Sequence, residues 1–194
     1  ALDNRQRYQL LTSLVVPRPI GWIGTWGADR VPNLAPFSYF AALSPTPMLV
    51  GVSIGRRREG PKDSLVNVRA TGAFSVNVVT EGQLEAMNQT AASHPPGVDE
   101  FREAGLSLAE ATAVDAPYVE DCPAVFACRL HKEVDLGVEG AALVIGEVMA
   151  VRLSSELEMV DDSCYVDSTS LKPVGRLWGS RYGLLGEIID LPRP

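Results

Sequence analysis

The densest group of cationic side chains in the sequence stands directly before a predicted helix. Three arginines beginning at Arg56 (residues 56–58) and Lys62 fall within seven residues of a chain whose net charge is −7. Asp63 and Ser64 follow, and they open a short predicted helix over residues 65–70. The N-terminus of a helix presents unpaired N–H groups and a positive dipole end, which together suit a phosphate. The pattern therefore indicates a site for an anionic ligand.

Two other interpretations of these residues remain open. The arginines could form a solvated surface loop, and Asp63 or Ser64 could serve only to cap the helix. A phosphate-binding loop of the P-loop type is excluded. Pro61 interrupts that motif before Lys62, and Asp63 stands where the motif needs a hydroxyl residue.

A second unusual stretch, NLAPFSYF at residues 33–40, reads as a strand interrupted by a proline. Pro36 has no N–H to donate to a ladder, so we expect this strand at a sheet edge or a bulge, where backbone groups stay free for a ligand. The alternative is an irregular edge strand that binds nothing. Beside the cationic loop, a free edge of this kind suits a flat, anionic ligand.

The rest of the pattern must position these two segments. Apolar runs predict strands, helical spacing predicts helices, and glycine or proline clusters predict turns. The predicted strands are residues 20–26, 33–40, 48–54, 73–79, 124–134 and 141–153, the last with a bulge at Gly146; the helices are residues 65–70 (ended by Gly72), 81–90 and 101–105; the turns are residues 27–30, 44–47 and 137–140. An apolar run at residues 10–16 ends at Pro17. We expect a single domain over residues 1–194, a mainly β (α+β) barrel with inserted helices.

Composition limits the classes of function. The acidic balance argues against nucleic acid as a partner. No apolar run approaches the roughly 20 residues of a membrane helix, and the first residues lack a signal-peptide pattern, so we expect a cytoplasmic protein that does not bind membranes. The three cysteines share no metal-ligand spacing, and His94 and His131 are the only histidines, so we expect no metal site. If the chain is an enzyme, a cofactor carries the chemistry.

Several segments, taken in order, resemble one known family. They are PRPIGWIGTWG (17–27), NLAPFSYFAALSPTPMLVGVSI (33–54), KDSLVNVRATGAFSVNVV (62–79), IGEVMAVRL (145–153) and KPVGRLWGSRYG (172–183). Together they resemble the flavin reductase-like, FMN-binding split-barrel proteins, and the flavoredoxin group in particular. The likeness covers most of the chain. It implies a Greek-key antiparallel split β-barrel, a homodimer, and one FMN near each subunit boundary.

The resemblance also implies a set of cofactor-binding residues. Along the flavin ring, largely through backbone groups, it places Asn33, Leu34, Ala35, Pro36, Phe37 and Ser38; around the phosphate it places Ser53, Arg56, Lys62, Asp63 and Ser64. Ser64 stands where the family usually has threonine, and it keeps the hydroxyl group. Arg176 and Tyr182 match a family segment near the flavin.

The function that the family implies is an NAD(P)H-dependent flavin reductase. The cofactor is FMN, with FAD as an alternative, and a nicotinamide nucleotide binds as a transient co-substrate. Hydride is accepted at flavin N5, so the protein supplies position and electrostatics rather than a catalytic side chain. Electrons then pass to free flavin, a partner oxygenase or another acceptor. The alternative is an FMN-binding electron carrier of the flavoredoxin type without its own nicotinamide activity. A pyridoxamine-phosphate-oxidase-like enzyme shares the barrel class, but the motifs fit it poorly.

Overall fold

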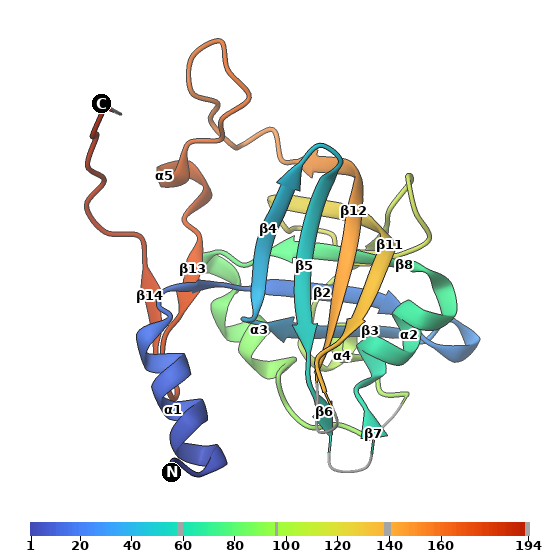
Figure 1. Ribbon diagram of the computed structural model, residues 1–194. Coiled ribbons are helices and arrows are strands. Elements are labelled where there is room, and N and C mark those ends of the chain that lie inside the picture. Colours follow the sequence, from blue (N-terminus) through green and yellow to red (C-terminus); the bar gives the residue numbers. More distant parts are fainter. Residues whose placement is uncertain (58–59, 96, 138–140, 193–194) are drawn as a thin grey trace.

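The computed structural model describes residues 1–57, 60–95, 97–137 and 141–192, and its central feature is an antiparallel sheet curved into a split barrel (Figure 1). Across the sheet the strand order is β3 (Pro32–Phe37), β2 (Gly21–Trp26), β8 (Ala73–Val78), β11 (Ala124–Asp135), β12 (Ala142–Leu153), β5 (Met48–Ile54) and β4 (Phe40–Pro45). Every neighbouring pair in this sheet is antiparallel. The mainly β fold predicted from the sequence is confirmed.

β3 and β4 form the two edges of the sheet although they are consecutive in the chain. Only Ser38 and Tyr39 separate them, so the chain passes from one edge to the other at this corner. The Ser53 amide of β5 donates to the Tyr39 carbonyl over 2.8 Å and holds the corner against the barrel. The single strand predicted over residues 33–40 is therefore two strands, because Ser38 and Tyr39 leave the ladder to make the crossing.

The open edge of β3 runs along Leu34 and Pro36. The Leu34 N–H donates to a side chain outside the sheet, so it points away from β2. In an antiparallel pair the backbone groups of alternate residues point the same way, so Pro36 also faces the open edge. Its missing N–H therefore leaves no gap in the β2–β3 ladder. The prediction that Pro36 marks an edge strand is confirmed.

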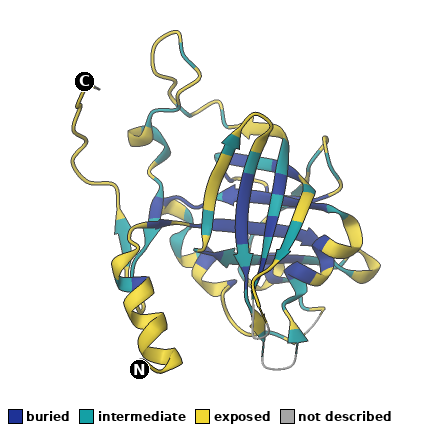
Figure 2. Ribbon diagram, viewed as in Figure 1, coloured by how far each residue is buried: buried dark blue, intermediate teal, exposed yellow. Residues whose placement is uncertain are grey.

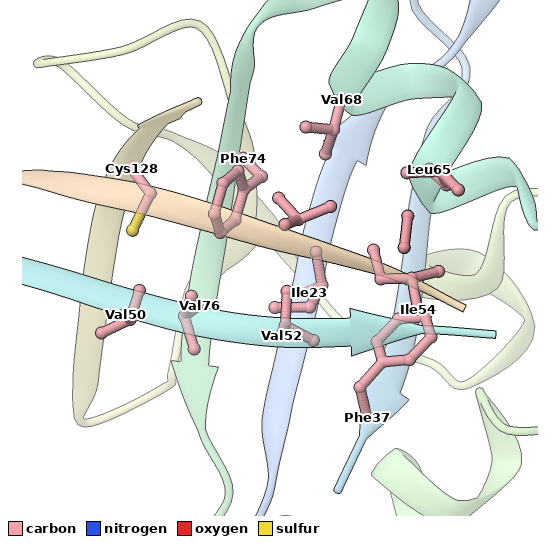
Figure 3. Close-up of a cluster of buried hydrophobic side chains, with 12 residues drawn as sticks. Ile23, Phe37, Val50, Val52, Ile54, Leu65, Val68, Phe74, Val76 and Cys128 are labelled. Atoms are coloured by element: carbon pink, nitrogen blue, oxygen red, sulfur yellow. The ribbon is translucent and has the colours of Figure 1, made fainter. Parts of the chain in front are cut away.

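Two apolar clusters hold the sheet together. The cluster inside the barrel is shown in Figure 3 and includes Ile23, Phe37, Val50, Val52, Ile54, Leu65, Val68, Phe74, Val76 and Cys128. A second cluster packs on the outer face of β2 and β8 and includes Trp22, Leu34, Val79, Met87 and Phe101. Burial of each large apolar side chain stabilises the fold by about 1.5–3 kcal/mol. Figure 2 shows the buried residues concentrated on the central strands.

The bulge predicted at Gly146 is displaced. The register between β11 and β12 shifts at His131 and again at Met149, whereas Gly146 stays paired with Leu130. A Cβ atom at Gly146 would collide with the Phe74 ring. Glycine is required there because an aromatic ring packs directly on the backbone, and the strand bends elsewhere.

Short helices follow the central strands. α2 (Asp63–Thr71) precedes β8 and ends at Gly72, whose φ of 70° is the left-handed conformation that glycine favours. The helices predicted at residues 81–90 and 101–105 correspond to η2 (Glu81–Gln83), α3 (Leu84–Gln89) and α4 (Glu100–Glu103), and the turn predicted at residues 27–30 contains η1 (Ala28–Arg30). These predictions are confirmed within a few residues.

α1 (Asn4–Leu14) takes up most of the apolar run at residues 10–16. A capping box begins it: the Gln6 N–H donates to Asp3 Oδ1 over 2.8 Å, and the Asp3 N–H donates to Gln6 Oε1 over 3.0 Å. The helix is exposed along most of its length, and Leu14 is 77% exposed. Its apolar side chains thus face away from the chain's own core.

The remaining elements are short. They are the three-stranded sheet of β1 (Arg18–Pro19), β13 (Val174–Arg176) and β14 (Tyr182–Leu184), the pair β9 (Leu108–Glu110) and β10 (Pro117–Val119), the pair β6 (Arg56–Arg57) and β7 (Gly60–Pro61), and α5 (Ser168–Leu171). Residues 154–167 and the C-terminal segment project from the barrel (Figure 1). Arg58 and residues 138–140 of the predicted turn at 137–140 lie outside the described residues. No described helix is both long and apolar enough to cross a membrane.

Candidate functional site

A buried polar network joins the start of β3 to the start of α2. Asn33 Oδ1 accepts a hydrogen bond from the Ser64 hydroxyl at 3.0 Å, and Asn33 Nδ2 donates to Glu100 Oε2 at 2.9 Å. The same carboxylate oxygen accepts the Leu34 N–H at 3.1 Å. Glu100 is only 5% exposed, so α4 covers this half of the open edge. The network fixes the helix N-terminus relative to the proline-containing half of β3.

The N-terminus of α2 has no side-chain cap. Lys62 occupies the cap position, and its side chain makes no capping hydrogen bond. Asp63 instead pairs with Arg57 at 2.7 Å, and the Ser64 hydroxyl is bound to Asn33. The interpretation of Asp63 or Ser64 as a plain helix cap is therefore wrong. In the described part of the chain, the amide N–H groups of Asp63 and Ser64 have no hydrogen-bond acceptor.

Lys62 provides positive charge beside these two amides. Its Nζ lies 4.9 Å from the centroid of the Phe37 ring, and Phe37 belongs to β3. Burial lowers the pKa of Lys62, and the nearby Arg57 charge lowers it further. Arg57 is paired with Asp63, whereas Lys62 takes part in no ion pair among the described residues. An anion bound here would raise the pKa of Lys62 again and would accept hydrogen bonds from the two free amides of the helix N-terminus.

Two hollows meet at Ser38, where β3 ends. The smaller, about 150 Å³, is lined by Ile20, Pro36, Ser38, Met87, Asn88, Ala91, Arg176 and Tyr182. The larger, about 360 Å³, is mostly apolar and includes Arg18, Ser38, Tyr39, Phe40, Leu43 and Leu143 in its wall. The Tyr182 hydroxyl donates to Asn88 Oδ1 at 3.0 Å, and Arg176 stacks 4.5 Å from the centroid of the Tyr182 ring. The fold thus brings the C-terminal residues Arg176 and Tyr182 to the end of β3.

Not every predicted site residue joins this group. Arg56 lines a separate hollow of about 300 Å³ with Arg69 and Glu133, which form an ion pair. The Leu34 side chain is fully buried, and its N–H is already bound to Glu100, so only its carbonyl remains for a ligand. Ser53 lies beside the corner, where its N–H donates a hydrogen bond to the Tyr39 carbonyl. Ala35 and Phe37 face the barrel core.

Two residues at this site were not predicted from the sequence. Glu100 holds the start of β3, and the buried Arg18 donates to the Ser38 hydroxyl at 3.4 Å. Neither role has a local signal, because Glu100 and Asn33 are 67 residues apart in the sequence and Arg18 and Ser38 are 20 apart. A charged residue inside an otherwise apolar or proline-rich segment, such as Arg18 between Pro17 and Pro19, is the one hint that the sequence offers.

Comparisons with known proteins identify the family and the fold. A family model described as "Flavin reductase like domain" matches residues 13–167. A Deinococcus radiodurans protein is 36% identical over 184 residues, which cover 92% of this chain and 80% of that protein. The structure of nitrilotriacetate monooxygenase component B from Bacillus cereus has a TM-score of 0.93 at 31% identity, over 98% of this chain and 95% of that one. The flavoredoxin of Desulfovibrio vulgaris (Miyazaki F) shares the fold, with a TM-score of 0.80 at 23% identity over 91% of each chain.

The family match includes both β3 and the start of α2. It covers well over half of the chain, and the structural likeness extends to the C-terminal sheet outside it. The split-barrel resemblance inferred from the ordered sequence segments is confirmed. The chain belongs to the flavin reductase-like family.

Proposed function

We propose that this protein binds FMN and uses it as an NAD(P)H-dependent flavin reductase. The observation that supports this most is the uncapped start of α2, with two free amides and Lys62, beside the open edge of β3. The uncapped helix start with Lys62 suits a phosphate. The open edge of β3 suits a flat heterocycle with hydrogen-bonding edges. Family membership makes flavin the natural ligand with both groups.

The described residues fit such a cofactor. The amides of Asp63 and Ser64 and the Lys62 ammonium would hold the phosphate, with the Ser53 hydroxyl as a further donor from β5. The Pro36 carbonyl and the corner at Ser38 would hold the ring, and Arg176 and Tyr182 would close the site from the C-terminal sheet. Arg56 has a weaker claim, because it faces the separate hollow near Arg69.

The bound flavin would supply a hydride acceptor, taking two electrons and one proton from NAD(P)H, which leaves as NAD(P)⁺. The chain's own residues bind, orient and compensate charge in this scheme. In this scheme no side chain acts as a general base. Similarity to a monooxygenase component B supports free flavin or a partner oxygenase as the electron acceptor. FAD in place of FMN remains an alternative within the same scheme.

Anaerobic mixing tests this function. The protein is loaded with FMN and mixed with NADH or NADPH while the flavin absorbance near the visible maximum is followed. We expect bleaching within minutes with at least one donor, and faster bleaching than with free FMN at the same concentration. FMN binding without bleaching by either donor would favour the alternative, an electron carrier of the flavoredoxin type. Absence of any FMN binding, by fluorescence titration, would contradict both.

We also propose that the protein works as a homodimer. The exposed side chains Leu11 and Leu14 of α1, and Ile189 and Leu191 of the C-terminal segment, are 52%, 77%, 77% and 87% exposed. Exposed large apolar side chains on such segments are typical of an interface with another subunit. α1 also forms part of the larger hollow at Ser38, so a second subunit seated on it would border the proposed flavin site.

A further inference from the structure

Arg18 is a buried arginine that has no acidic partner in the part of the chain that the structure describes. Only 6% of it is exposed, and none of the ion pairs among the described residues includes it. Its N–H groups donate to neutral acceptors, namely the carbonyls of Thr12 (2.7 Å), Val15 (2.6 Å) and Leu177 (2.7 Å) and the hydroxyl of Ser38 (3.4 Å). These bonds satisfy the donors but do not cancel the charge.

A second arginine lies directly opposite. Arg18 and Arg176 are paired residues in the β1–β13 ladder, and Arg176 also takes part in none of the ion pairs among the described residues. Like charges at paired positions of a ladder repel each other. The C-terminal carbonyls of α1 near Arg18 contribute only about half a negative charge. Net positive charge therefore remains at this end of β3.

This charge faces the hollows that meet at Ser38. Arg18 lines the larger hollow and Arg176 lines the smaller one, and neither is lined by an aspartate or a glutamate of the described chain. Tyr39 lines the larger hollow together with Arg18. Burial and the nearby Tyr8 raise the pKa of Tyr39, and the charge of Arg18 acts in the opposite direction.

We propose that Arg18, supported by Arg176, favours the reduced, anionic form of a flavin bound along β3 over the oxidised, neutral form. This inference rests on the proposed function. Hydride uptake by oxidised flavin adds one negative charge, which is carried on the pyrimidine edge of the ring. Positive charge at the Ser38 end of β3 stabilises the product of that step and not its reactant. Arg18 thus acts through its charge and through Ser38, whose hydroxyl it binds, and it does not need to touch the flavin itself.

Replacement of Arg18 by methionine removes the charge and keeps an unbranched side chain. The measurements are the dissociation constant for oxidised FMN by fluorescence and the midpoint potential of the bound flavin by anaerobic spectroelectrochemistry. We expect Arg18→Met to weaken binding of reduced FMN about tenfold more than binding of oxidised FMN, the size of a charge interaction over roughly 12 Å at an effective dielectric constant of about 20. That ratio corresponds to a midpoint potential lower by about 30 mV.

Two further variants separate charge from structure. Arg18→Lys keeps the charge and loses several hydrogen bonds, so its ratio of reduced to oxidised affinity should stay within about threefold of the parent protein. Arg152→Met removes a positive charge that also binds a backbone carbonyl, that of Cys122, far from β3 in the sheet order. It should leave the ratio unchanged.

Each outcome decides the proposal. A folded Arg18→Met protein that binds oxidised FMN with an unchanged midpoint potential overturns it, while FMN binding by the parent protein leaves the proposed function standing. If Arg18→Met is not properly folded, as shown by the loss of cooperative unfolding, Arg176→Met is tested instead. We expect that variant to lower the ratio of reduced to oxidised FMN affinity about threefold. No shift in that variant also overturns the proposal. A parent protein that binds no FMN removes the proposed function itself.

Discussion

At the scale of single residues, the start of α2 is unusual because its two most favourable capping residues are used elsewhere. Asp63 pairs with Arg57, and the Ser64 hydroxyl binds Asn33. The helix therefore begins with free amides beside Lys62, a half-buried cation whose pKa is lowered. An anion bound here would accept from the free amides and pair with the ammonium group, so Lys62 is the first residue to test.

We predict that Lys62→Ala weakens FMN binding by about 1–3 kcal/mol, the scale of a hydrogen bond to a charged group. Fluorescence titration with FMN measures this directly. Lys132→Ala, which removes an exposed lysine of β11, is the matched control and should bind FMN as the parent protein does. Equal affinity of the Lys62→Ala and parent proteins would remove Lys62 from the site.

The cysteines give a residue-scale prediction that is independent of any ligand. Burial raises the pKa of Cys122 to about 11 and that of Cys128 to about 12, whereas Cys164 is exposed. At pH 8 we expect a thiol reagent to react quickly with one cysteine of the native protein and with three after denaturation. A second fast thiol in the native protein would show that one of the buried positions opens readily.

The same thiols set a pH dependence. The unfolded chain loses thiol protons above about pH 9, while the folded chain keeps them until about pH 11 to 12. The unfolded state then binds fewer protons, so the free energy of unfolding falls as the pH rises through this window. Urea unfolding at pH 8 and pH 10 measures the fall, and Cys128→Ala should reduce it.

At the scale of elements, α4 and β3 depend on one carboxylate. Glu100 accepts both the Asn33 amide and the Leu34 N–H inside the protein. We predict that Glu100→Ala lowers the free energy of unfolding by about 1–3 kcal/mol relative to Glu100→Gln, because two buried donors lose their acceptor. Glu100→Gln keeps an oxygen of the same reach. Urea unfolding compares the two variants, and equal stabilities would mean that water replaces the carboxylate without cost.

The element scale also shows how much of the fold was predictable. The strands at residues 48–54, 73–79, 124–134 and 141–153, and α2 with Gly72, follow local patterns of apolar residues and breakers. α1 does not, because its apolar residues face away from the core, and the Asp3–Gln6 capping box is its clearest local signal. The corner at Ser38 was read as continuous strand, since a crossing between sheet edges is set by the closure of the barrel.

The sequence predicts which residues form the candidate site better than it predicts which groups those residues bind. The proline edge and the cationic helix start are local features, and the fold brings them together as expected. The partners of Asn33 and Ser64 are not local. The Arg18 guanidinium binds the nearby carbonyls of Thr12 and Val15, but also a carbonyl 159 residues later in the sequence. No pattern in one sequence states which distant carbonyl or carboxylate will satisfy a buried polar group.

At the scale of the whole molecule, the exposed apolar surface of α1 predicts the oligomeric state. We expect light scattering to give twice the monomer mass at micromolar concentration. The double variant Leu11→Glu, Leu14→Glu should give a monomer, because charge at an apolar interface is costly. Leu136→Glu changes a residue of similar exposure, 53%, directly after β11 and is the control. A monomeric parent protein would contradict the proposed dimer.

Pro36 has a consequence beyond ligand binding. An uncovered sheet border is a template on which a strand from another molecule can grow, and this leads to aggregation. β3 is such a border: Glu100 covers its first half, and no described strand pairs with the outer side of its second half. A strand from another molecule that docked there would meet the pyrrolidine ring of Pro36 where it needs an N–H donor, so the hydrogen-bonded ladder between the two molecules would stop. We therefore expect the residue that leaves the border open to the proposed ligand also to oppose polymerisation through the same border.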